Sequence, residues 1–140
     1  MIIRNYRTIT FIILFTVLTK PSFSQQNDDL IGDWKITKVE LTPNAGQEEK
    51  QMLVMLRQIF SKSTFHFKNN NLFSFESPDK DLAIKEASWK FDVTKKYIKV
   101  TERVTKGNSG QLMGITVKII AGQYLFFMEE SPVVLTVIKK

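Results

Sequence analysis

The sequence predicts an all-β fold, an eight-stranded antiparallel up-and-down barrel with one helix between strands 1 and 2. Apolar and polar residues alternate with the two-residue period of strands through most of the chain after residue 30. Short turn-like segments separate these stretches, and hairpins drawn across them bring apolar residues to one shared face. Eight strands joined in this way are expected to close, because closure leaves no exposed sheet edge.

The strand pattern recurs along the chain, and a helical pattern interrupts it once. Strands are expected at residues 31–41, 62–69, 72–77, 86–92, 96–104, 112–121, 124–129 and 133–139. The segment from Gln47 to Phe60 instead has apolar residues at the i, i+3, i+4, i+7 spacing of a helix face, namely Met52, Met55, Leu56 and Ile59. A helix this apolar is expected to lie against the open end of the barrel.

The N-terminal residues 1–24 have the three zones of a secretory signal peptide. Two arginines precede an apolar run from Ile9 to Leu18, and two small serines follow it. We expect cleavage between Ser24 and Gln25, which leaves a single domain of residues 25–140; the alternative is a buried first helix. The apolar run is shorter than the roughly 20 residues of a bilayer span. The mature protein is therefore expected in the periplasm or outside the cell.

Charge and cysteine content exclude several classes of function. The expected leader contains three bases, Arg4, Arg7 and Lys20, and no acid, so the formal net charge falls from +6 to +3 after cleavage. A charge this small does not predict a nucleic-acid-binding surface. The chain has no cysteine, which excludes disulfides, thiolate metal sites and a cysteine nucleophile. It also excludes a lipid-modified cysteine, so we expect a protein that is neither membrane-spanning nor lipid-anchored.

The apolar residues of the first strand move from one face of the strand to the other along its length. Simple alternation places Trp34 and Ile36 on one face and Val39 and Leu41 on the other. A β-bulge near Thr37 explains this change, because the extra residue of a bulge shifts the alternation by one.

The second and third strands contain four phenylalanines. A loop of three asparagines, residues 69–71, pairs Phe67 with Phe73 and Phe65 with Phe75, and paired residues share a face. A two-residue turn would divide the rings between the two faces, so the three-residue loop is expected. Asparagine tolerates the left-handed conformation that such loops need.

The same reasoning gives the registers of the later hairpins. A loop around residues 93–96 pairs Phe91 with Ile98 and Trp89 with Val100; a loop of residues 121–123 pairs Ile119 with Leu125 and Val117 with Phe127; a loop of residues 130–132 pairs Phe127 with Leu135 and Leu125 with Val137. The resulting inner face supplies the candidate lining of a ligand cavity: Phe65, Phe67, Phe73, Phe75, Trp89, Phe91, Ile98, Val100, Ile115, Val117, Leu125, Phe127 and Leu135.

A Gly-x-Trp motif, Gly32 and Trp34, opens the first strand directly after the expected leader. In this position the motif resembles the lipocalins and related calycins, and it is most similar to the short lipocalin-like domains of exported bacterial proteins. The resemblance implies that Gly32 allows a tight turn at the barrel floor and that Trp34 plugs the narrow end. The arginine that typical lipocalins pack on this tryptophan is replaced here by Lys139 or Lys140, so the resemblance does not transfer a ligand class.

The sequence predicts no enzyme activity, no cofactor and no metal site. His66 is the only histidine, and alternation places it on the outer face, opposite Phe65 and Phe67. A zinc site at His66 would need carboxylates alone beside it. Serine–histidine catalysis would also depend on His66, and the chain contains no nucleophile elbow.

Two functions remain open at this point. The first is a carrier with a small hydrophobic ligand in the barrel interior, although an eight-stranded barrel can equally be filled by its own side chains. The second is a filled barrel that acts as an inhibitor-like or protein-interaction module, as a homodimer or with a protein partner. It would use an outer apolar patch on strands 7 and 8, consisting of Tyr124, Phe126, Met128, Val134 and Ile138. Alternatively, the first strand, the helix or the linker from Gln25 to Asp29 covers that face.

Overall fold

The computed structural model describes residues 28–103 and 110–140 of the chain. The chain divides into two units, Met1–Leu30 and Ile31–Lys140. In the first unit only residues 28–30 are described, and they are helical; the predicted signal peptide, residues 1–24, lies outside the described residues. Among the helices that are described, none has the length and apolar character needed to cross a membrane.

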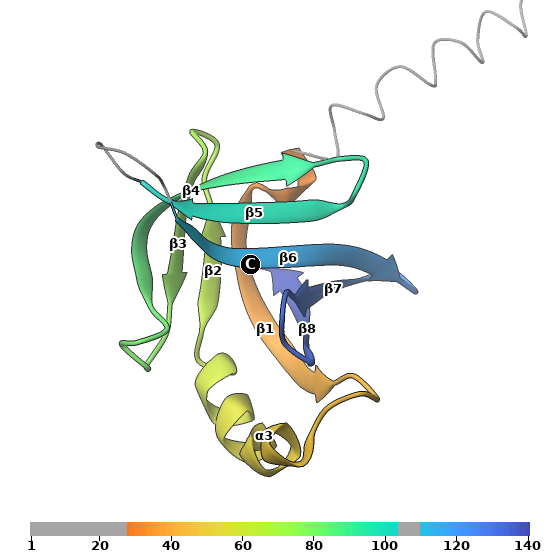
Figure 1. Cartoon of the computed structure of the whole chain (residues 1–140). Helices are drawn as coiled ribbons and strands as arrows, with labels where there is room; N and C mark the ends of the chain where they lie inside the picture. Colours follow the sequence, from red (N-terminus) through yellow and green to blue (C-terminus); the bar gives the residue numbers. More distant parts are fainter. Residues whose placement is uncertain (1–27, 104–109) are drawn as a thin grey trace, which may run out of the picture. The chain divides into compact units, whose positions relative to one another are not determined.

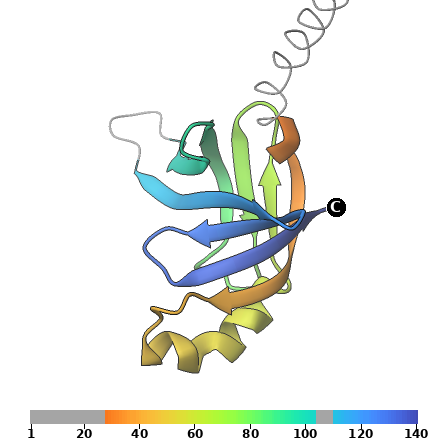
Figure 2. The same ribbon diagram turned by 90° about the vertical axis from the view of Figure 1, so that its right-hand side faces the viewer.

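The second unit is a closed barrel of eight antiparallel strands in the order β1 to β8 (Figures 1 and 2). The strands are β1 (Gly32–Leu41), β2 (Thr64–Phe67), β3 (Leu72–Glu76), β4 (Ile84–Asp92), β5 (Tyr97–Glu102), β6 (Gln111–Ile120), β7 (Gln123–Met128) and β8 (Val133–Lys139), and α3 (Gln47–Phe60) lies between β1 and β2. The predicted fold class is confirmed, the helix has the expected bounds, and each strand ends within two residues of its expected limits.

The up-and-down order places alternate connections at opposite ends of the barrel. One end, called the tryptophan end because Trp34 lies near it, contains the connections 68–71, 93–96 and 121–122. The other, called the helix end, contains α3 and the connections 77–83 and 129–132. Both ribbon views show α3 below the strands at the helix end (Figures 1 and 2).

The β2–β3 hairpin has the predicted register. Phe65 pairs with Phe75 and Phe67 pairs with Phe73. All four side chains are at most 2% exposed, and neighbouring rings lie 4.8 to 6.3 Å apart. Asn71 adopts the left-handed conformation, with φ of 63°, that the three-residue loop requires. The phenylalanines therefore point together into the barrel, as the alternation predicts.

Two further aromatic side chains complete this interior cluster. The Phe126 ring, which is fully buried, lies 5.3 Å from that of Phe65. The Trp89 ring lies 5.1 Å from that of Phe67, and its indole N–H donates a 3.0 Å hydrogen bond to the Lys68 carbonyl. Trp89 can be buried because this bond satisfies its only polar atom. Aromatic rings in mutual contact thus fill the middle of the barrel.

β1 contains the predicted β-bulge, at the point where its apolar residues change face. The register of β1 against β8 shifts just after Ile36. As a result Trp34, Ile36 and Val39 are all buried. The Thr37 hydroxyl at the bulge donates a 3.2 Å hydrogen bond to the carbonyl of Thr136. The bulge allows one continuous strand to pack inward along its whole length.

Trp34 closes the tryptophan end. Its ring is 2% exposed and lies 4.8 Å from that of Tyr124 and 6.0 Å from that of Phe126. The Lys139 ammonium lies 5.3 Å from the Trp34 ring centre, within the range of a cation–π interaction. Gly32 has a φ of 140°, which disfavours any other residue, and its missing side chain leaves room for the aliphatic part of Lys139.

β7 is shifted by one residue from its predicted register, and this prediction was wrong. Ala121 and Gly122 form a two-residue turn, both with positive φ, in place of the expected loop of residues 121–123. The observed pairs are Val117 with Phe126, Ile119 with Tyr124, Phe126 with Leu135 and Tyr124 with Val137. Phe126 is therefore buried inside the barrel, whereas Leu125 and Phe127 lie half-buried on the opposite face of β7.

The two adjacent phenylalanines of β7 give a direct test of this register. Replacement of Phe126 by alanine removes a fully buried ring and is expected to lower the free energy of unfolding by about 3–5 kcal/mol. Phe127→Ala removes a half-buried ring and is expected to cost less than half as much. Urea unfolding monitored by circular dichroism measures both values. Equal losses, or a larger loss for Phe127→Ala, would contradict the observed register.

Candidate functional site

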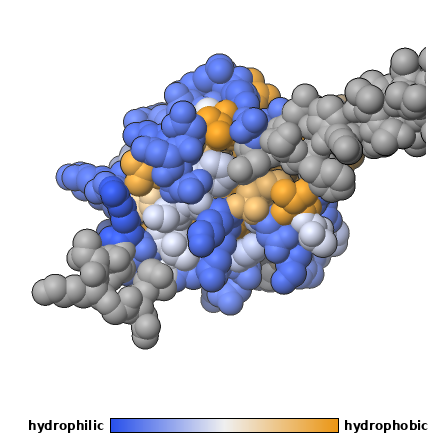
Figure 3. All heavy atoms as spheres, turned by 90° about the horizontal axis from the view of Figure 1, so that it is seen from above, coloured by the Kyte–Doolittle hydropathy of each residue, from blue (hydrophilic) through white to orange (hydrophobic). Residues whose placement is uncertain are grey.

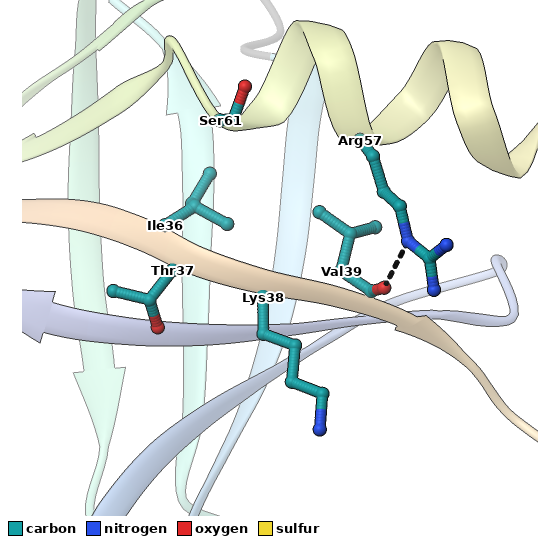
Figure 4. A pocket seen from close by; sticks show the side chains of 6 residues that line it. All are labelled: Ile36, Thr37, Lys38, Val39, Arg57 and Ser61. Atoms are coloured by element: carbon teal, nitrogen blue, oxygen red, sulfur yellow. Dashed lines mark hydrogen bonds between the residues drawn. The ribbon is translucent and has the colours of Figure 1, made fainter.

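The described part of the chain contains a pocket between α3 and β1. It is lined by Ile36, Thr37, Lys38, Val39, Arg57 and Ser61 and has a volume of about 330 Å³. Figure 4 shows Ile36 and Val39 pointing from β1 toward the helix, while Lys38 points away from it. The bulge after Ile36 places both aliphatic side chains on this side of β1. The pocket therefore has an apolar floor of two buried side chains and a roof formed by the end of the helix.

Arg57 brings positive charge to the edge of this pocket. It lies in the last turn of α3, and its Nε donates a 3.3 Å hydrogen bond to the Val39 carbonyl (Figure 4). This bond holds the guanidinium over the apolar floor and leaves its other N–H groups for a further acceptor. Within residues 28–103 and 110–140, no ion pair involves Arg57. Lys38, by contrast, forms an exposed ion pair with Glu40.

The helix over the pocket is only loosely packed. None of its residues is buried, and Met52, Val54 and Met55 are 45%, 65% and 49% exposed. Its main partner is β1, and the ring of Phe60 lies 6.3 Å from that of Phe75. The helix lies at the end of the barrel, as its amphipathic pattern predicts, but much of its apolar surface remains exposed. Elements with so few buried contacts open at low free-energy cost.

Most residues of the predicted ligand lining lie inside the barrel. The buried ones are Phe65, Phe67, Phe73, Phe75, Trp89, Ile98, Val100, Ile115, Val117 and Leu135. Phe91 is half-buried and pairs with Ile98, as predicted. Leu125 and Phe127 do not belong to this set, because the register of β7 places them on the outer face.

The predicted outer patch on strands 7 and 8 is not brought together. Phe126 is fully buried and Tyr124 contacts Trp34, so both point inward. Of the other predicted members, Met128 and Val134 are half-buried and Ile138 is 44% exposed. The outer face of β7 instead carries Leu125 and Phe127, and the Lys118 ammonium lies 4.5 Å from the centre of the Phe127 ring.

The pocket beneath α3 was missed by the sequence reasoning, which looked for a ligand site in the barrel interior. The two elements that form the pocket were each predicted from the sequence. The change of face of the apolar residues in β1 predicts the bulge, and the apolar spacing of residues 47–60 predicts the helix. Their combination depends on the angle at which α3 crosses β1, and no local pattern encodes that angle.

A second hollow lies between the start of α3 and the β7–β8 connection. It is lined by Asn44, Glu49, Glu130, Ser131 and Pro132 and has a volume of about 410 Å³. Its lining is largely polar, and both of its charged residues are acidic. It lacks the apolar floor of the pocket beneath α3, so it is the weaker candidate for a hydrophobic ligand.

His66 lies between two carboxylates on the outside of the barrel. Its Nδ1 lies 2.5 Å from Oδ1 of Asp33, and its Nε2 lies 3.2 Å from Oε1 of Glu76 without hydrogen-bond geometry. Asp33 is the cross-strand partner of His66, so the contact follows directly from the β1–β2 register. In the described residues, no group of three or more histidine and acidic side chains is arranged to hold a metal ion.

A second polar cluster joins three strands on the outer surface. The Tyr97 hydroxyl donates a 2.5 Å hydrogen bond to Oε2 of Glu129, and the Gln111 amide donates to both, at 2.9 and 2.7 Å. Gly114 lies directly beneath, where a Cβ would clash with Tyr97 and Glu129. Desolvation of the phenol raises the pKa of Tyr97, and the hydrogen bond to Glu129 raises this pKa further. The cluster links β5 and β6 to the end of β7.

The comparisons with known proteins give one structural likeness. No family model and no curated protein match the chain. Its fold is similar to that of a DUF4847 family protein from Bacteroides vulgatus. The sequences are 10% identical, the TM-score is 0.46, and the similarity covers 78% of this chain and 94% of that protein.

The Tyr97 cluster predicts a specific dependence of stability on pH. Because the pKa of Tyr97 is higher in the folded than in the unfolded protein, its contribution is fully present below about pH 10 and is lost as the pH rises through the folded-state pKa. The difference in unfolding free energy between the unmodified protein and Tyr97→Phe should therefore shrink between pH 8 and pH 11. Urea unfolding at each pH measures it. A difference that grows with pH would contradict the assignment.

Proposed function

We propose that this chain is an exported, lipocalin-like binding protein that holds a small hydrophobic ligand in the pocket between α3 and β1. The observation that carries the proposal is the combination of a floor of buried aliphatic side chains, Ile36 and Val39, with a helix that covers them loosely. A volume of about 330 Å³ falls at the lower end of the roughly 300–1,000 Å³ typical of small-molecule sites. The protein acts by binding, without catalysis.

The filled interior supports a ligand site at the mouth of the barrel. Phe65, Phe67 and Phe126 contact one another, with ring centres between 5.3 and 6.1 Å apart. A ligand in the middle of the barrel would have to displace these rings, and each lost aromatic contact costs free energy. The pocket beneath α3 requires no such displacement. A ligand that enters it covers aliphatic surface and reaches the apolar side of the helix.

The charge at the pocket edge favours a ligand with an anionic end. Arg57 is held over the floor by its bond to the Val39 carbonyl, and its remaining donors are suited to a carboxylate, sulfonate or phosphate. Its aliphatic stem extends the apolar wall. An amphiphile with a short apolar body and one acidic group therefore matches both parts of the site.

A substitution that fills the pocket tests its location. Ser61 lies at the end of α3 and lines the pocket, whereas Gln58 is an exposed residue of the same helix outside the lining. Ser61→Trp should weaken binding of the neutral fluorescent probe N-phenyl-1-naphthylamine at least about tenfold, which corresponds to 1.4 kcal/mol, while Gln58→Trp leaves it unchanged. Equal affinities for all three proteins, or equal losses in both variants, would place the probe elsewhere.

A matched pair of probes tests the role of Arg57. The anion 8-anilino-1-naphthalenesulfonate and neutral N-phenyl-1-naphthylamine share their aromatic skeleton and differ in the sulfonate. Arg57→Gln should weaken binding of the anion about tenfold, because a charge-assisted hydrogen bond is lost, and should leave the neutral probe unchanged. Arg103→Gln, which removes an exposed arginine paired with Glu86, is the control. A parallel loss for both probes would mean that Arg57 supports the fold and does not bind the anion.

A further inference from the structure

The tryptophan end of the barrel exposes aliphatic side chains at the tip of a hairpin. Ile119 and Ile120, the last two residues of β6, are 60% and 54% exposed. The turn of Ala121 and Gly122 follows them directly. Ile138, near the end of β8, is 44% exposed at the same end. Branched aliphatic side chains this exposed have no role in the core.

The same end is strongly basic. It carries six exposed lysines, Lys68, Lys95, Lys96, Lys118, Lys139 and Lys140. Its acids in the second unit are Asp33, which contacts His66, and Asp92, which accepts hydrogen bonds from the backbone N–H groups of Thr94 and Lys95 at 3.0 and 3.1 Å. Of the three hairpin connections at this end, 68–71 and 93–96 contain lysines, and none contains an acid.

The helix end has a different charge. Its described connections, α3 included, contain six acids, Glu48, Glu49, Asp79, Asp81, Glu129 and Glu130, against four bases, Lys50, Arg57, Lys62 and Lys80. Charge is therefore polarised along the axis of the barrel, although the net charge of the mature chain is small.

The surface seen from above in Figure 3 is mostly hydrophilic, with small separate hydrophobic areas. An end that combines cationic charge with exposed aliphatic groups is suited to an anionic, partly apolar partner.

We propose that the tryptophan end docks on the surface of a membrane that contains anionic phospholipids. Ile119 and Ile120 enter the region between headgroups and acyl chains, and the surrounding lysines interact with the lipid phosphates. Peripheral binding of this kind needs both contributions, because apolar insertion and electrostatic attraction are each weak alone. Docking in this orientation leaves the helix end, with the pocket beneath α3, directed away from the membrane.

The chemistry of the patch favours lipid over a protein or a nucleic acid. Protein interfaces concentrate their binding energy in tryptophan, tyrosine and arginine, whereas this tip presents isoleucines among lysines. Proteins that bind single-stranded nucleic acids stack bases on aromatic side chains, and the exposed large apolar residues at this end are Ile119, Ile120 and Ile138. Lysine acts as a flexible point charge, which suits the fluid array of phosphates on a bilayer.

Cosedimentation with vesicles tests the proposal. The protein is recovered after export, its intact mass is recorded, and it is mixed with vesicles of phosphatidylcholine alone or of phosphatidylcholine with phosphatidylglycerol. Binding is expected only to the anionic vesicles and should be lost near 1 M salt, where the Debye length falls to about 3 Å. Lys95→Glu/Lys96→Glu and Ile119→Ser/Ile120→Ser should each weaken partitioning at least about tenfold.

Matched variants at the helix end serve as controls. Lys50→Glu/Lys62→Glu changes the net charge by the same amount as the lysine variant above, and Val54→Ser/Met55→Ser removes similarly exposed apolar groups. Both control variants should bind vesicles like the unmodified protein. Circular dichroism verifies that every variant is folded. Absence of binding to the anionic vesicles, equal binding to neutral vesicles or equal losses in the control variants would overturn the proposal. So would a dimer that dissociates on Ile119→Ser/Ile120→Ser without any vesicle binding, because the tip would then contact a second copy.

Discussion

The mutual packing of Phe65, Phe67 and Phe126 inside the barrel is the interaction on which the rest of the structure depends. These rings come from β2 and β7, which are not neighbours in the sheet, so their contact requires the barrel to be closed. A shift of one residue in β2 would turn Phe65 and Phe67 to the solvent and point polar residues into the barrel. The bulge in β1 has the same origin, because it brings Trp34 and Val39 to one side of a strand whose sequence alternation alone would separate them.

The register of a strand could be predicted from the sequence where apolar and polar residues alternate, and not where every residue is apolar. In β2 and β3 the phenylalanines alternate with polar residues, so only one loop length keeps the rings together, and the register of Phe65 and Phe67 was predicted correctly. In β7 the residues Tyr124 to Met128 are all apolar or aromatic, so both registers bury a similar set of side chains. The choice is made by the turn. Ala121 adopts a left-handed conformation that alanine rarely takes. The Ala-Gly pair therefore indicates a two-residue hairpin turn less clearly than Asn-Gly would.

The candidate site was less predictable than the fold, because it forms between elements and not within one. The sequence predicts α3 to the residue, and it predicts the bulge of β1, yet the pocket exists only because Arg57 and Ser61 lie above Ile36 and Val39. Hydrophobic periodicity identifies which face of a helix is apolar, but it does not specify how much of that face will be covered. Here the coverage is incomplete, and the proposed binding role of α3 depends on this exposed apolar surface.

The two ends of the barrel can take different roles because the strands between them are fixed by their hydrogen bonds and by core packing. Along the sides, backbone groups are paired around the closed sheet and the inward side chains belong to one core, so neither can change without unfolding. At the ends the constraints are weaker. Trp34 and Lys139 seal one end with a ring and a long side chain, and its outer surface is then free to carry lysines and isoleucines at no cost to the core. At the other end the same aromatic core provides a rigid base, and α3 rests on it with few buried contacts. A rigid middle with one sealed and one loosely covered end thus permits a surface function and a pocket function within one small domain, because a change at either end leaves the core packing intact.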